Sequence, residues 1–500
     1  MESQQFDAEK EMFSLPIGVR YNLGISDGVP GSRNLAVFQP ENPSTFTGTS
    51  NNVVRIPISA NGQFLDLKNA VLGFKFENKA TGGTTAQKTC TLDGGAQAII
   101  QRLRVLQNGN EIERIDSYGQ IATVLDQYAG NITSLVTGCT QNGGPRRLSN
   151  TTKTPSTAIA ASSNETLADG TNIATGAIGG SITVVNELGG KGYMQEECDS
   201  LQHDTARTYQ FGLKNAFFNP STAKMLPPGV GITLELTLNS PANCLKYGAG
   251  SGTTTAAYHA TNFEMSIPVV TIHDNNAMAR LNARLARGVS WKANTFHHHV
   301  NTMTAGAGPA SIQIGERSRV LKGLISIFRP QEDLADQEKF KLSKRTVQPL
   351  DNFQYIIGSS QFPMNQVNLV CDSAKPAAGT AAGTRLGLAS DSGQDISHAY
   401  NEVLRVFGGL NSNMSSCVIG AEPYMQSTLN NGAGLIAVDL QAYSDGSVSS
   451  GIDTASNSLP VMLNVQKNAV LAAKILQVDT YSVSEMTIMV DGFGNLMSES

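Results

Sequence analysis

The chain carries the same pair of short sequence landmarks twice, in the same order. The first landmark is LKNAVLGF at residues 67–74 and LKGLISIF at residues 321–328, and the second is EMSI at 264–267 and EMTI at 485–488. The interval between the landmarks is longer in the first copy by about thirty residues, and surface loops accept such added length at a small cost in free energy. The repeat therefore predicts one β-domain used twice.

Chain length supports two domains, since 500 residues are too many for one ordinary core. The first residues are interrupted by prolines and glycines and predict an extended arm, either a clamp on a neighbouring subunit or an unstructured terminus. A stretch rich in Thr, Ser, Gly, Ala and Asn has no periodicity and predicts an exposed tower or lid. We predict four regions: an arm at 1–45, a first jelly roll at 46–274 with a loop insertion at about 134–205, a helical linker at 275–288, and a second jelly roll at 289–500.

Strand patterns, with apolar residues at every second position or in short Val/Ile-rich runs, recur along both halves. In the first half they cover residues 53–58, 70–76, 99–106, 111–115, 209–213, 231–238 and 263–272. In the second half they cover residues 289–291, 311–314, 320–328, 352–357, 435–443, 461–465, 472–481 and 486–490. Roughly eight patterns per copy is the jelly-roll number, so the predicted class is all-β, with two tandem eight-stranded jelly-roll barrels, short helices and long loop insertions.

Turn and helix signals complete this framework. Asn108-Gly109 predicts a type I′ hairpin turn, and Asp491-Gly492 predicts a closing hairpin between residues 486–490 and 492–496. Helical spacing of apolar residues predicts short helices at 118–128, at 275–288 ending at Gly288, and near 396–407. A second long loop is expected at 372–394.

The chain is poor in charge, with 15% charged residues against the usual ~25%. A surface with so few charges lacks the usual solubility device of a free monomer, and the centres of assembly interfaces are depleted in charge. We therefore expect burial against neighbouring chains. The net charge of −5 argues against a protein that binds nucleic acid over a broad face.

The six cysteines contain no Cys-x-x-Cys pair, which predicts free thiols rather than a zinc or redox motif. The first thirteen residues have no apolar core and do not resemble a secretory signal. No window approaches the ~20 apolar residues of a membrane span.

Candidate sites were few. His297, His298 and His299 are consecutive, and on a strand the first and third face one side and the second faces the other. With no carboxylate or cysteine adjacent, a polar strand or subunit contact is the favoured interpretation, and a metal or pH-sensing cluster at a threefold axis is the minor one. Residues 432–437 imitate a dinucleotide-binding fingerprint but precede a strand, whereas that motif must follow one.

No phosphate-binding loop, nucleophile elbow or His-Glu-x-x-His motif occurs, and no pair of carboxylates points to catalysis. The sequence thus predicts no catalytic, cofactor-binding or metal site and no cofactor. Arg280, Arg284 and Arg287 share one face of the linker helix, which would contact DNA or acidic groups of a neighbour, or remain a solvated or ion-paired face.

The segment IGERSRVLKGLISIFRP at residues 314–330 resembles a strand pair of the second barrel in double jelly-roll major capsid proteins of double-stranded DNA viruses, of the polinton-like, virophage and large DNA virus types. The blocks at 53–76, 99–115 and 479–492 follow in the same order as in that family. The resemblance covers about residues 45–500 and consists of strand order and type more than of invariant chemistry.

The resemblance implies a structural, non-enzymatic protein that forms pseudo-hexagonal homotrimers tiling an icosahedral shell around a double-stranded DNA genome. Its implied partners are its own copies, neighbouring capsomers, penton and minor capsid proteins and, weakly, packaged DNA, with no small-molecule substrate. The implied location is the virion, assembled inside the infected host cell. Two alternatives stay open: a minor vertex or spike capsid protein, and a carbohydrate-binding β-sandwich protein, against which the low aromatic content of 6% argues.

Overall fold

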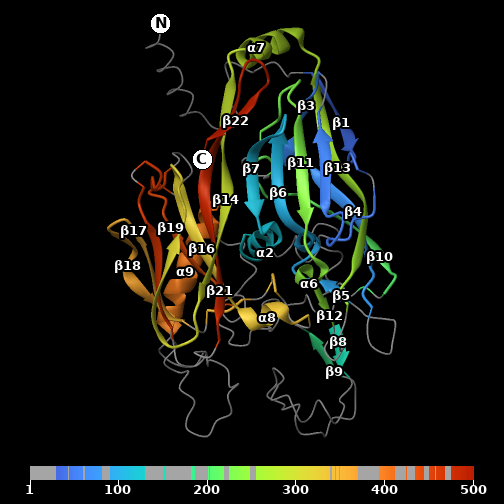
Figure 1. Ribbon diagram of the computed structural model, residues 1–500. Helices are drawn as coiled ribbons and strands as arrows, with labels where there is room; N and C mark the ends of the chain where they lie inside the picture. Colours follow the sequence, from blue (N-terminus) through green and yellow to red (C-terminus); the bar gives the residue numbers. More distant parts are fainter. Residues whose placement is uncertain are drawn as a thin grey trace, which may run out of the picture.

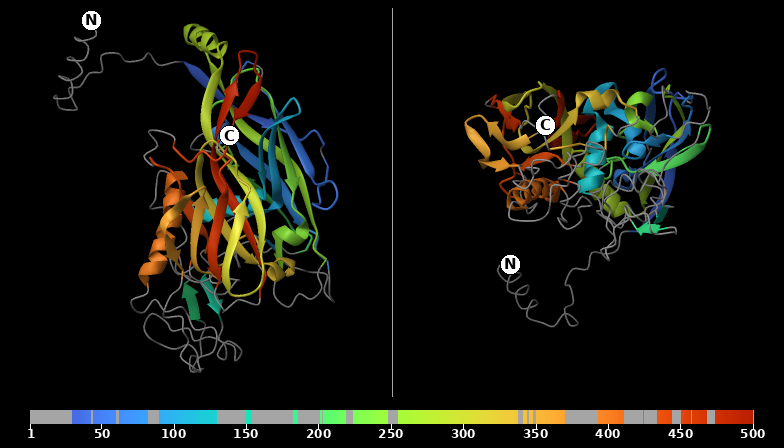
Figure 2. Two further views of the ribbon diagram at one scale, coloured as in Figure 1. Left: turned by 60° about the vertical axis from the view of Figure 1, so that its left-hand side comes forward. Right: turned by 90° about the horizontal axis from the view of Figure 1, so that it is seen from below.

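The computed structural model describes residues 30–42, 44–59, 62–81, 90–129, 150–153, 182–185, 201, 203–218, 224–247, 255–337, 341–343, 345–347, 350–369, 393–410, 424, 434–443, 450–456, 458–467 and 474–499. Over these residues the chain forms two β-barrels that lie side by side (Figure 1). Helix α7 (Asn275–Leu285) connects them at one end, and the same arrangement is seen from a second direction in Figure 2.

Two antiparallel sheets make the first barrel. One sheet has the order β1 (Gly31–Phe38), β13 (Tyr258–Ile272), β4 (Val71–Asn78), β10 (Ala206–Phe211), with β3 (Phe64–Leu65) also paired to β13. The other has the order β2 (Val53–Ile58), β11 (Ile232–Leu238), β6 (Ile100–Gln107), β7 (Asn110–Asp116).

The second barrel repeats this plan. One sheet has the order β14 (Val289–Met303), β21 (Leu476–Val490), β16 (Leu321–Pro330), β19 (Ile436–Asp439), with β22 (Leu496–Glu499) also paired to β21. The other has the order β15 (Gly308–Ile314), β20 (Val461–Lys467), β17 (Leu350–Ile357), β18 (Ser360–Asn368). Numbered along the chain within each barrel, the eight main strands run 1-8-3-6 and 2-7-4-5 in both, so the predicted pair of eight-stranded jelly rolls is confirmed.

The sequence explains the strands through alternating burial. β2 alternates buried and exposed residues, as expected of a strand with one face on the core. In the β6–β7 hairpin, Asn108 and Gly109 both have positive φ angles, 51° and 84°, which confirms the predicted turn. Aromatic rings fill the first core, where Phe74 stacks on Phe263 with ring centroids 5.2 Å apart.

The two landmarks of the sequence repeat lie on topologically equivalent strands, but their registers differ. Leu72 of the first copy lies opposite Met265 on β13. Ser326, the residue matched to Leu72, lies opposite Thr480 on β21, six residues before Met486. The repeat thus identified the right strands through residue type, while the pairing register was set separately in each barrel.

Helix α2 (Tyr118–Tyr128) is buried on all sides. The sequence predicted one apolar face, yet its polar side, including Gln120 and Gln127, is also covered because the helix lies between the barrels. On the second barrel's side, Tyr128 stacks on Phe407 of α9 (Gly393–Leu410), with centroids 5.0 Å apart. The shorter elements are α6 (Pro241–Cys244), α8 (Gln331–Ala335), η2 (Leu67–Asn69), η3 (Ala96–Ile99), β5 (Cys90–Leu92) and β12 (Leu245–Tyr247). None of the described helices is long and apolar enough to cross a membrane.

The predicted arm at 1–45 is corrected in its later part. Gly31–Phe38 forms the edge strand β1, with Gly31 opposite Ile272 and Phe38 opposite Met265. Ala36 and Phe38 pack against the core, because alternate residues of the strand point inward. Residues 1–29 lie outside the described residues, and the domain boundaries and the clamp hypothesis stay predictions.

The predicted C-terminal hairpin is present with a longer loop. Residues 491–495 form the loop, and Val490 lies opposite Leu496. The loop is wider than the predicted turn because the Asp491 carboxylate accepts hydrogen bonds from the N–H groups of Phe493 and Asn495. The strands predicted at 472–481 and 486–490 are joined in the single strand β21.

The loop insertion predicted at 134–205 contains two strands, β8 (Asn150–Lys153) and β9 (Ile182–Val185), which pair with each other. They lie at the end of the molecule away from α7 (Figures 1 and 2). Most of this insertion, and the loop expected at 372–394 up to residue 392, lie outside the described residues, so the predicted tower is untested.

Candidate functional site

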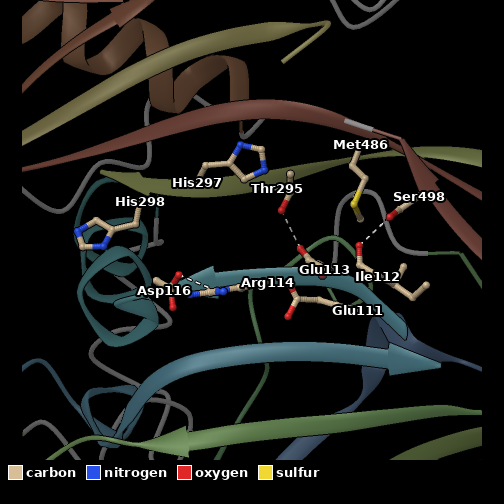
Figure 3. A pocket seen from close by; sticks show the side chains of 10 residues that line it. All are labelled: Glu111, Ile112, Glu113, Arg114, Asp116, Thr295, His297, His298, Met486 and Ser498. Atoms are coloured by element: carbon tan, nitrogen blue, oxygen red, sulfur yellow. Dashed lines mark hydrogen bonds and ion pairs between the residues drawn. The ribbon is translucent and has the colours of Figure 1, made fainter. Parts of the chain in front are cut away.

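The two barrels meet along what we call the inter-barrel seam, where β7 of the first barrel lies against β14 and β22 of the second (Figure 1). A pocket of about 330 Å³ opens at this seam (Figure 3). Its lining is mostly polar and comes from both barrels: Glu111, Ile112, Glu113, Arg114, Asp116, Thr295, His297, His298, Met486 and Ser498.

Hairpins from the two barrels are hydrogen-bonded to each other at one end of the seam. The Gln107 side chain donates to the Gly494 carbonyl oxygen at 2.9 Å and accepts from the Leu496 N–H. The Ser498 hydroxyl donates to the Ile112 carbonyl oxygen at 2.8 Å. The β6–β7 and β21–β22 hairpins therefore form one connected structure across the domain boundary.

Glu113 is the most deeply buried carboxylate of the pocket, with 3% of its surface exposed. Its two oxygens accept from the Asn215 amide at 2.6 Å, the Ala216 N–H at 2.9 Å and the Thr295 hydroxyl at 3.0 Å. Thr295 lies on β14, so this carboxylate links the barrels directly. Burial raises the pKa of Glu113 to about 7, and the three donors limit that rise.

The side chains of the three consecutive histidines point to alternate faces of β14, as the two-residue periodicity of a strand predicts. His297 Nδ1 lies 3.1 Å from one Glu316 oxygen and His299 Nε2 lies 2.9 Å from the other, while His298 Nε2 lies 3.0 Å from Asp479 on the opposite face. No carboxylate is adjacent to the three histidines in the sequence, but two carboxylates contact them in the folded chain. Glu316 lies in the β15–β16 connection and Asp479 lies on β21, and strand pairing brings both to β14.

Glu316 is 2% exposed and also accepts a hydrogen bond from the Ser482 hydroxyl. Burial alone would raise its pKa, but the hydrogen bonds from His297, His299 and Ser482 and the interaction with the His297 charge hold the pKa of Glu316 well below its usual value. Burial likewise opposes charge on His297, yet its bond to Glu316 and the charges of Glu316 and Glu113 raise the pKa of this imidazole. His297, His299 and Glu316 therefore form a hydrogen-bonded cluster on one face of β14.

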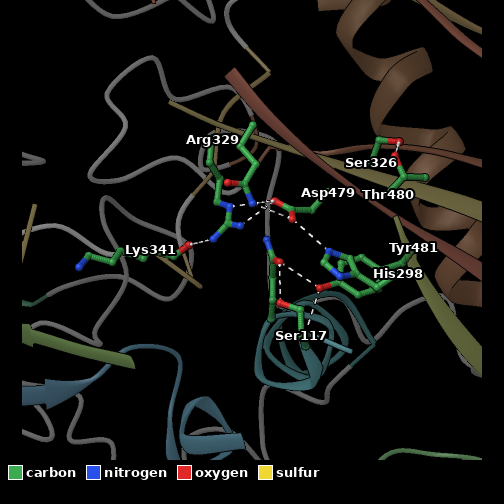
Figure 4. A network of polar contacts seen from close by, with 10 residues as sticks. Ser117, His298, Ser326, Arg329, Lys341, Asp479, Thr480 and Tyr481 are labelled. Carbon is green, nitrogen blue, oxygen red and sulfur yellow. Dashed lines mark hydrogen bonds and ion pairs between the residues drawn. The ribbon is translucent and has the colours of Figure 1, made fainter. Parts of the chain in front are cut away.

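On the other face of β14, Asp479 is the centre of a polar network (Figure 4). Arg329 donates to one Asp479 oxygen through Nε at 3.2 Å and Nη2 at 2.6 Å, and its Nη1 donates to the Lys341 carbonyl oxygen at 2.6 Å. Only 7% of Arg329 and 1% of Asp479 are exposed. Despite burial, the charge of Arg329 and the bond from His298 lower the pKa of Asp479.

Tyr481 extends this network into the first barrel. Its ring stacks on His298 with centroids 4.7 Å apart. Its hydroxyl lies 3.1 Å from the Ser117 carbonyl oxygen and 2.9 Å from the Gln120 side-chain oxygen, both belonging to the α2 region (Figure 4). The buried helix α2 is thus held to strand β21 by a tyrosine.

Asp93 of the first barrel contacts a backbone segment of the second barrel. Its carboxylate accepts hydrogen bonds from the N–H groups of Lys341, Leu342 and Ser343 and from the Ser343 hydroxyl. These residues precede β17 of the second barrel and are buried. One carboxylate of the first barrel therefore satisfies three consecutive backbone donors of the second.

Arg345 crosses the seam next to this segment and is 1% exposed. Its Nη2 donates to the Gln127 side-chain oxygen at 2.5 Å, and its guanidinium carbon lies 5.5 Å from the centre of the Tyr128 ring. An arginine over an aromatic face gains from the negative quadrupole of the ring. Both partners belong to α2, so this helix contacts the second barrel along its length.

The chemistry of the seam is structural. Within the described ranges, no group of three or more His, Cys, Asp or Glu side chains has the geometry to hold a metal ion. The histidine nitrogens nearest the carboxylates are used in the contacts above, and the carboxylates accept from several donors each. The contacts described above join the two barrels through buried polar groups whose hydrogen bonds are made.

The remaining predicted positions lie away from the seam. Cys90 and Cys244 are free and buried, and the other four cysteines lie outside the described residues. Burial raises the pKa of Cys90 to about 12, so this thiol is not a reactive thiolate. Residues 432–437 imitate a dinucleotide-binding fingerprint. The part of this segment that the structure describes leads into β19, which agrees with the prediction that it precedes a strand.

Sequence reasoning missed Glu113, Glu316, Asp479, Arg329 and Asp93. Each meets its main partners only through contacts between separate elements of the chain. A charged residue inside a long strand pattern, as Asp479 is in β21, was the one local signal available.

We predict that the protein is more stable at pH 5.5 than at pH 8. Glu113 has a folded pKa of about 7 against an ordinary value of 4.5, so the folded state binds its proton more tightly, and stability falls as the pH rises through that interval. The raised pKa of His297 acts with the same sign. Between these two pH values the Glu113 contribution changes by about 2 kcal/mol, which urea unfolding at the two pH values measures.

Glu113→Gln should remove most of this pH dependence. Glu111→Gln, on the same strand but exposed, is the matched control and should leave the pH dependence unchanged. An unchanged slope in the Glu113 variant would contradict the assignment. The carboxylates with lowered pKa, Glu316 and Asp479, titrate below this window and reduce stability only in acid.

No protein-family model and no curated protein sequence matches the chain. Solved structures do match, over almost the whole length. The structure is similar to the "Faustovirus major capsid protein", with a TM-score of 0.53, 9% identity and coverage of 99% of this chain and 94% of that chain.

Two further structures have the same arrangement. A chain of the "PBCV-1 virus capsid, quasi-atomic model" has a TM-score of 0.52 and 9% identity, covering 95% of this chain and 98% of that chain. A chain of the Sputnik virophage structure determined by cryo-EM has a TM-score of 0.51 and 12% identity, covering 96% and 92%. The chain therefore has the double jelly-roll fold that is found in major capsid proteins of double-stranded DNA viruses.

Proposed function

We propose that this chain is a major capsid protein that forms homotrimers tiling an icosahedral shell around a double-stranded DNA genome. The observation that carries the proposal is the end-to-end match with capsid proteins, in which both chains are covered almost completely. Such coverage leaves no additional described domain that would need another activity. The polar seam supports a mechanical role, because it fixes the barrels relative to each other.

Physical reasoning supports a trimer. Two barrels of the same topology in one chain give six barrels in three chains, a pseudo-hexagonal unit that packs in a plane. Each four-stranded sheet has two edge strands, and contacts between copies in a closed trimer would cover some of them and so limit uncontrolled edge pairing.

Exposed apolar side chains on edge strands are candidates for the contact between copies. Leu35 and Val37 on β1 are 60% and 50% exposed, and Met364 on β18 is 83% exposed. Both strands lie at the edge of their sheets. Large apolar side chains at such places favour burial against another chain.

We predict a species near 159 kDa in solution, three times the 52.9 kDa chain, measured by light scattering. Leu35→Lys combined with Val37→Lys should shift the mass toward that of one chain, because two charges would enter an apolar contact. The thermal unfolding midpoint of the variant is the control for folding. A wild-type monomer at all concentrations would contradict the trimer.

The proposed partners follow from this role: further trimers, penton and minor capsid proteins and, weakly, packaged DNA. The proposed location is the virion, with assembly inside the infected host cell. We also propose that the protein is not an enzyme, since its described carboxylates at the seam serve as hydrogen-bond acceptors.

A minor vertex or spike protein would be expected to have a less complete second barrel. Both barrels have the same four-plus-four set of strands among the described residues, which favours the major capsid role. The carbohydrate-binding alternative requires aromatic platforms, and the single tryptophan, Trp291, is only 9% exposed.

A further inference from the structure

The end of the molecule at α7 presents an unpaired basic surface. Arg280, Arg284 and Arg287 are exposed, and their positions repeat at helical spacing along one side of the helix and its C-terminal turn. Within the described residues none of the three side chains takes part in an ion pair or hydrogen bond. We call these three residues the arginine face.

Two acidic groups next to α7, Asp274 at its N-cap and Asp491 in the loop that packs on its end, are already engaged by backbone amides. Asp274 caps the helix by accepting from the Asn276 N–H at 2.8 Å. Asp491, in the β21–β22 loop, accepts from its own loop at 2.9 Å and 2.8 Å. Neither carboxylate has a salt bridge to an arginine in the described structure, so the charge of the arginine face is left for another partner.

An exposed aromatic residue lies beside this surface. The β21–β22 loop packs on the end of α7, where a Cβ on Gly492 would come within 2.4 Å of the Ala286 carbonyl oxygen. The next residue, Phe493, is 94% exposed. A partner for this end of the molecule therefore needs acidic groups together with apolar side chains.

The chain itself supplies such a segment close by. The His273 N–H donates to the Pro30 carbonyl oxygen at 2.8 Å, so residue 30 lies next to the start of α7. The preceding sequence, MESQQFDAEKEMF at residues 1–13, contains four acidic residues, one lysine, two phenylalanines and two methionines. A segment of 29 residues can extend up to about 95 Å, whereas α7 is only about 16 Å long.

We propose that residues 2–13 dock on the arginine face of α7 in the same chain. Their carboxylates pair with the three arginines, and their apolar side chains cover Phe493. Covalent connection through residue 30 gives this segment a high effective concentration at α7, which favours it over a free partner. The inference does not depend on the capsid role.

Native-state chymotrypsin cleavage after Phe6 and Phe13, followed by intact-mass spectrometry, tests the docking. Arg280→Glu/Arg284→Glu/Arg287→Glu should speed cleavage about tenfold, the effect expected of three exposed ion pairs. Adding Glu2→Lys, Asp7→Lys, Glu9→Lys and Glu11→Lys to that variant should restore slow cleavage. The charge-matched control, Lys75→Glu/Lys224→Glu/Arg317→Glu, alters exposed residues elsewhere and should cleave like the wild type.

Salt and dilution separate the remaining outcomes. Wild-type cleavage should accelerate in 0.5 M NaCl, a salt range in which exposed ion pairs are screened, and should not depend on protein concentration. Equal rates in wild type and arginine variant, or protection lost on dilution, would overturn docking within one chain. Arginine-dependent binding to duplex DNA or anionic vesicles with unchanged cleavage would identify a different occupant and also overturn it.

Discussion

Arg329→Met is expected to lower the free energy of unfolding by about 3 to 5 kcal/mol. The substitution keeps an apolar stem of similar length but leaves the Asp479 carboxylate, which is 1% exposed, without its guanidinium partner. It also removes the donor to the Lys341 carbonyl oxygen. A buried charge that has lost its partner costs far more than an intact pair contributes, and urea unfolding measures the difference.

A double-mutant cycle separates this charge effect from lost packing. Asp479→Asn added to Arg329→Met removes the unpaired charge while an amide oxygen remains for His298, so the double variant should be more stable than Arg329→Met alone. Arg319→Met is the matched control, because its partner Glu499 is exposed and surface pairs contribute about 0 to 1 kcal/mol. An equal decrease in the free energy of unfolding in Arg329→Met and Arg319→Met would show that the buried pair contributes no more than an exposed one.

Features set by local conformation could be predicted from the sequence. The β6–β7 turn followed from Asn108-Gly109, since both positions need positive φ angles. The sequence pattern predicts two strands, at 472–481 and 486–490, where the structure has the single strand β21. In the structure Glu485 is 5% exposed and pairs with Lys292 and Lys322, so tertiary partners allow the strand to continue.

The seam could not be predicted, because its contacts join residues far apart in the chain. His298 lies opposite Tyr481 only because β14 and β21 pair over fifteen residues in one register. Asp93 stands before two glycines and has the sequence of an ordinary turn. A resemblance in strand order contains no information on such pairs, and the same fold accommodates different polar networks.

Asp93→Ala is expected to lower the free energy of unfolding by about 4 kcal/mol. The substitution leaves the N–H groups of Lys341, Leu342 and Ser343 without their acceptor, and these residues are 4%, 6% and 0% exposed. Each buried donor without a partner costs about 1 to 3 kcal/mol, which relaxation of the segment partly recovers. Asp453→Ala removes a comparable acceptor from a turn that solvent reaches, and should have a much smaller effect.

Asp93 and Arg329 both bind Lys341, so combining the two substitutions tests whether these contacts stabilise the protein as one unit. The Lys341 N–H donates to Asp93 of the first barrel, and the Lys341 carbonyl oxygen accepts from Arg329 of the second, which in turn holds Asp479. Because both substitutions release the same residue, the Asp93→Ala/Arg329→Met variant should lose less stability than the two single losses combined, by about 0.5 to 3 kcal/mol. Additive losses in urea unfolding would mean that Asp93 and Arg329 anchor their barrels independently, and that residues 341–343 do not transmit the orientation of one barrel to the other.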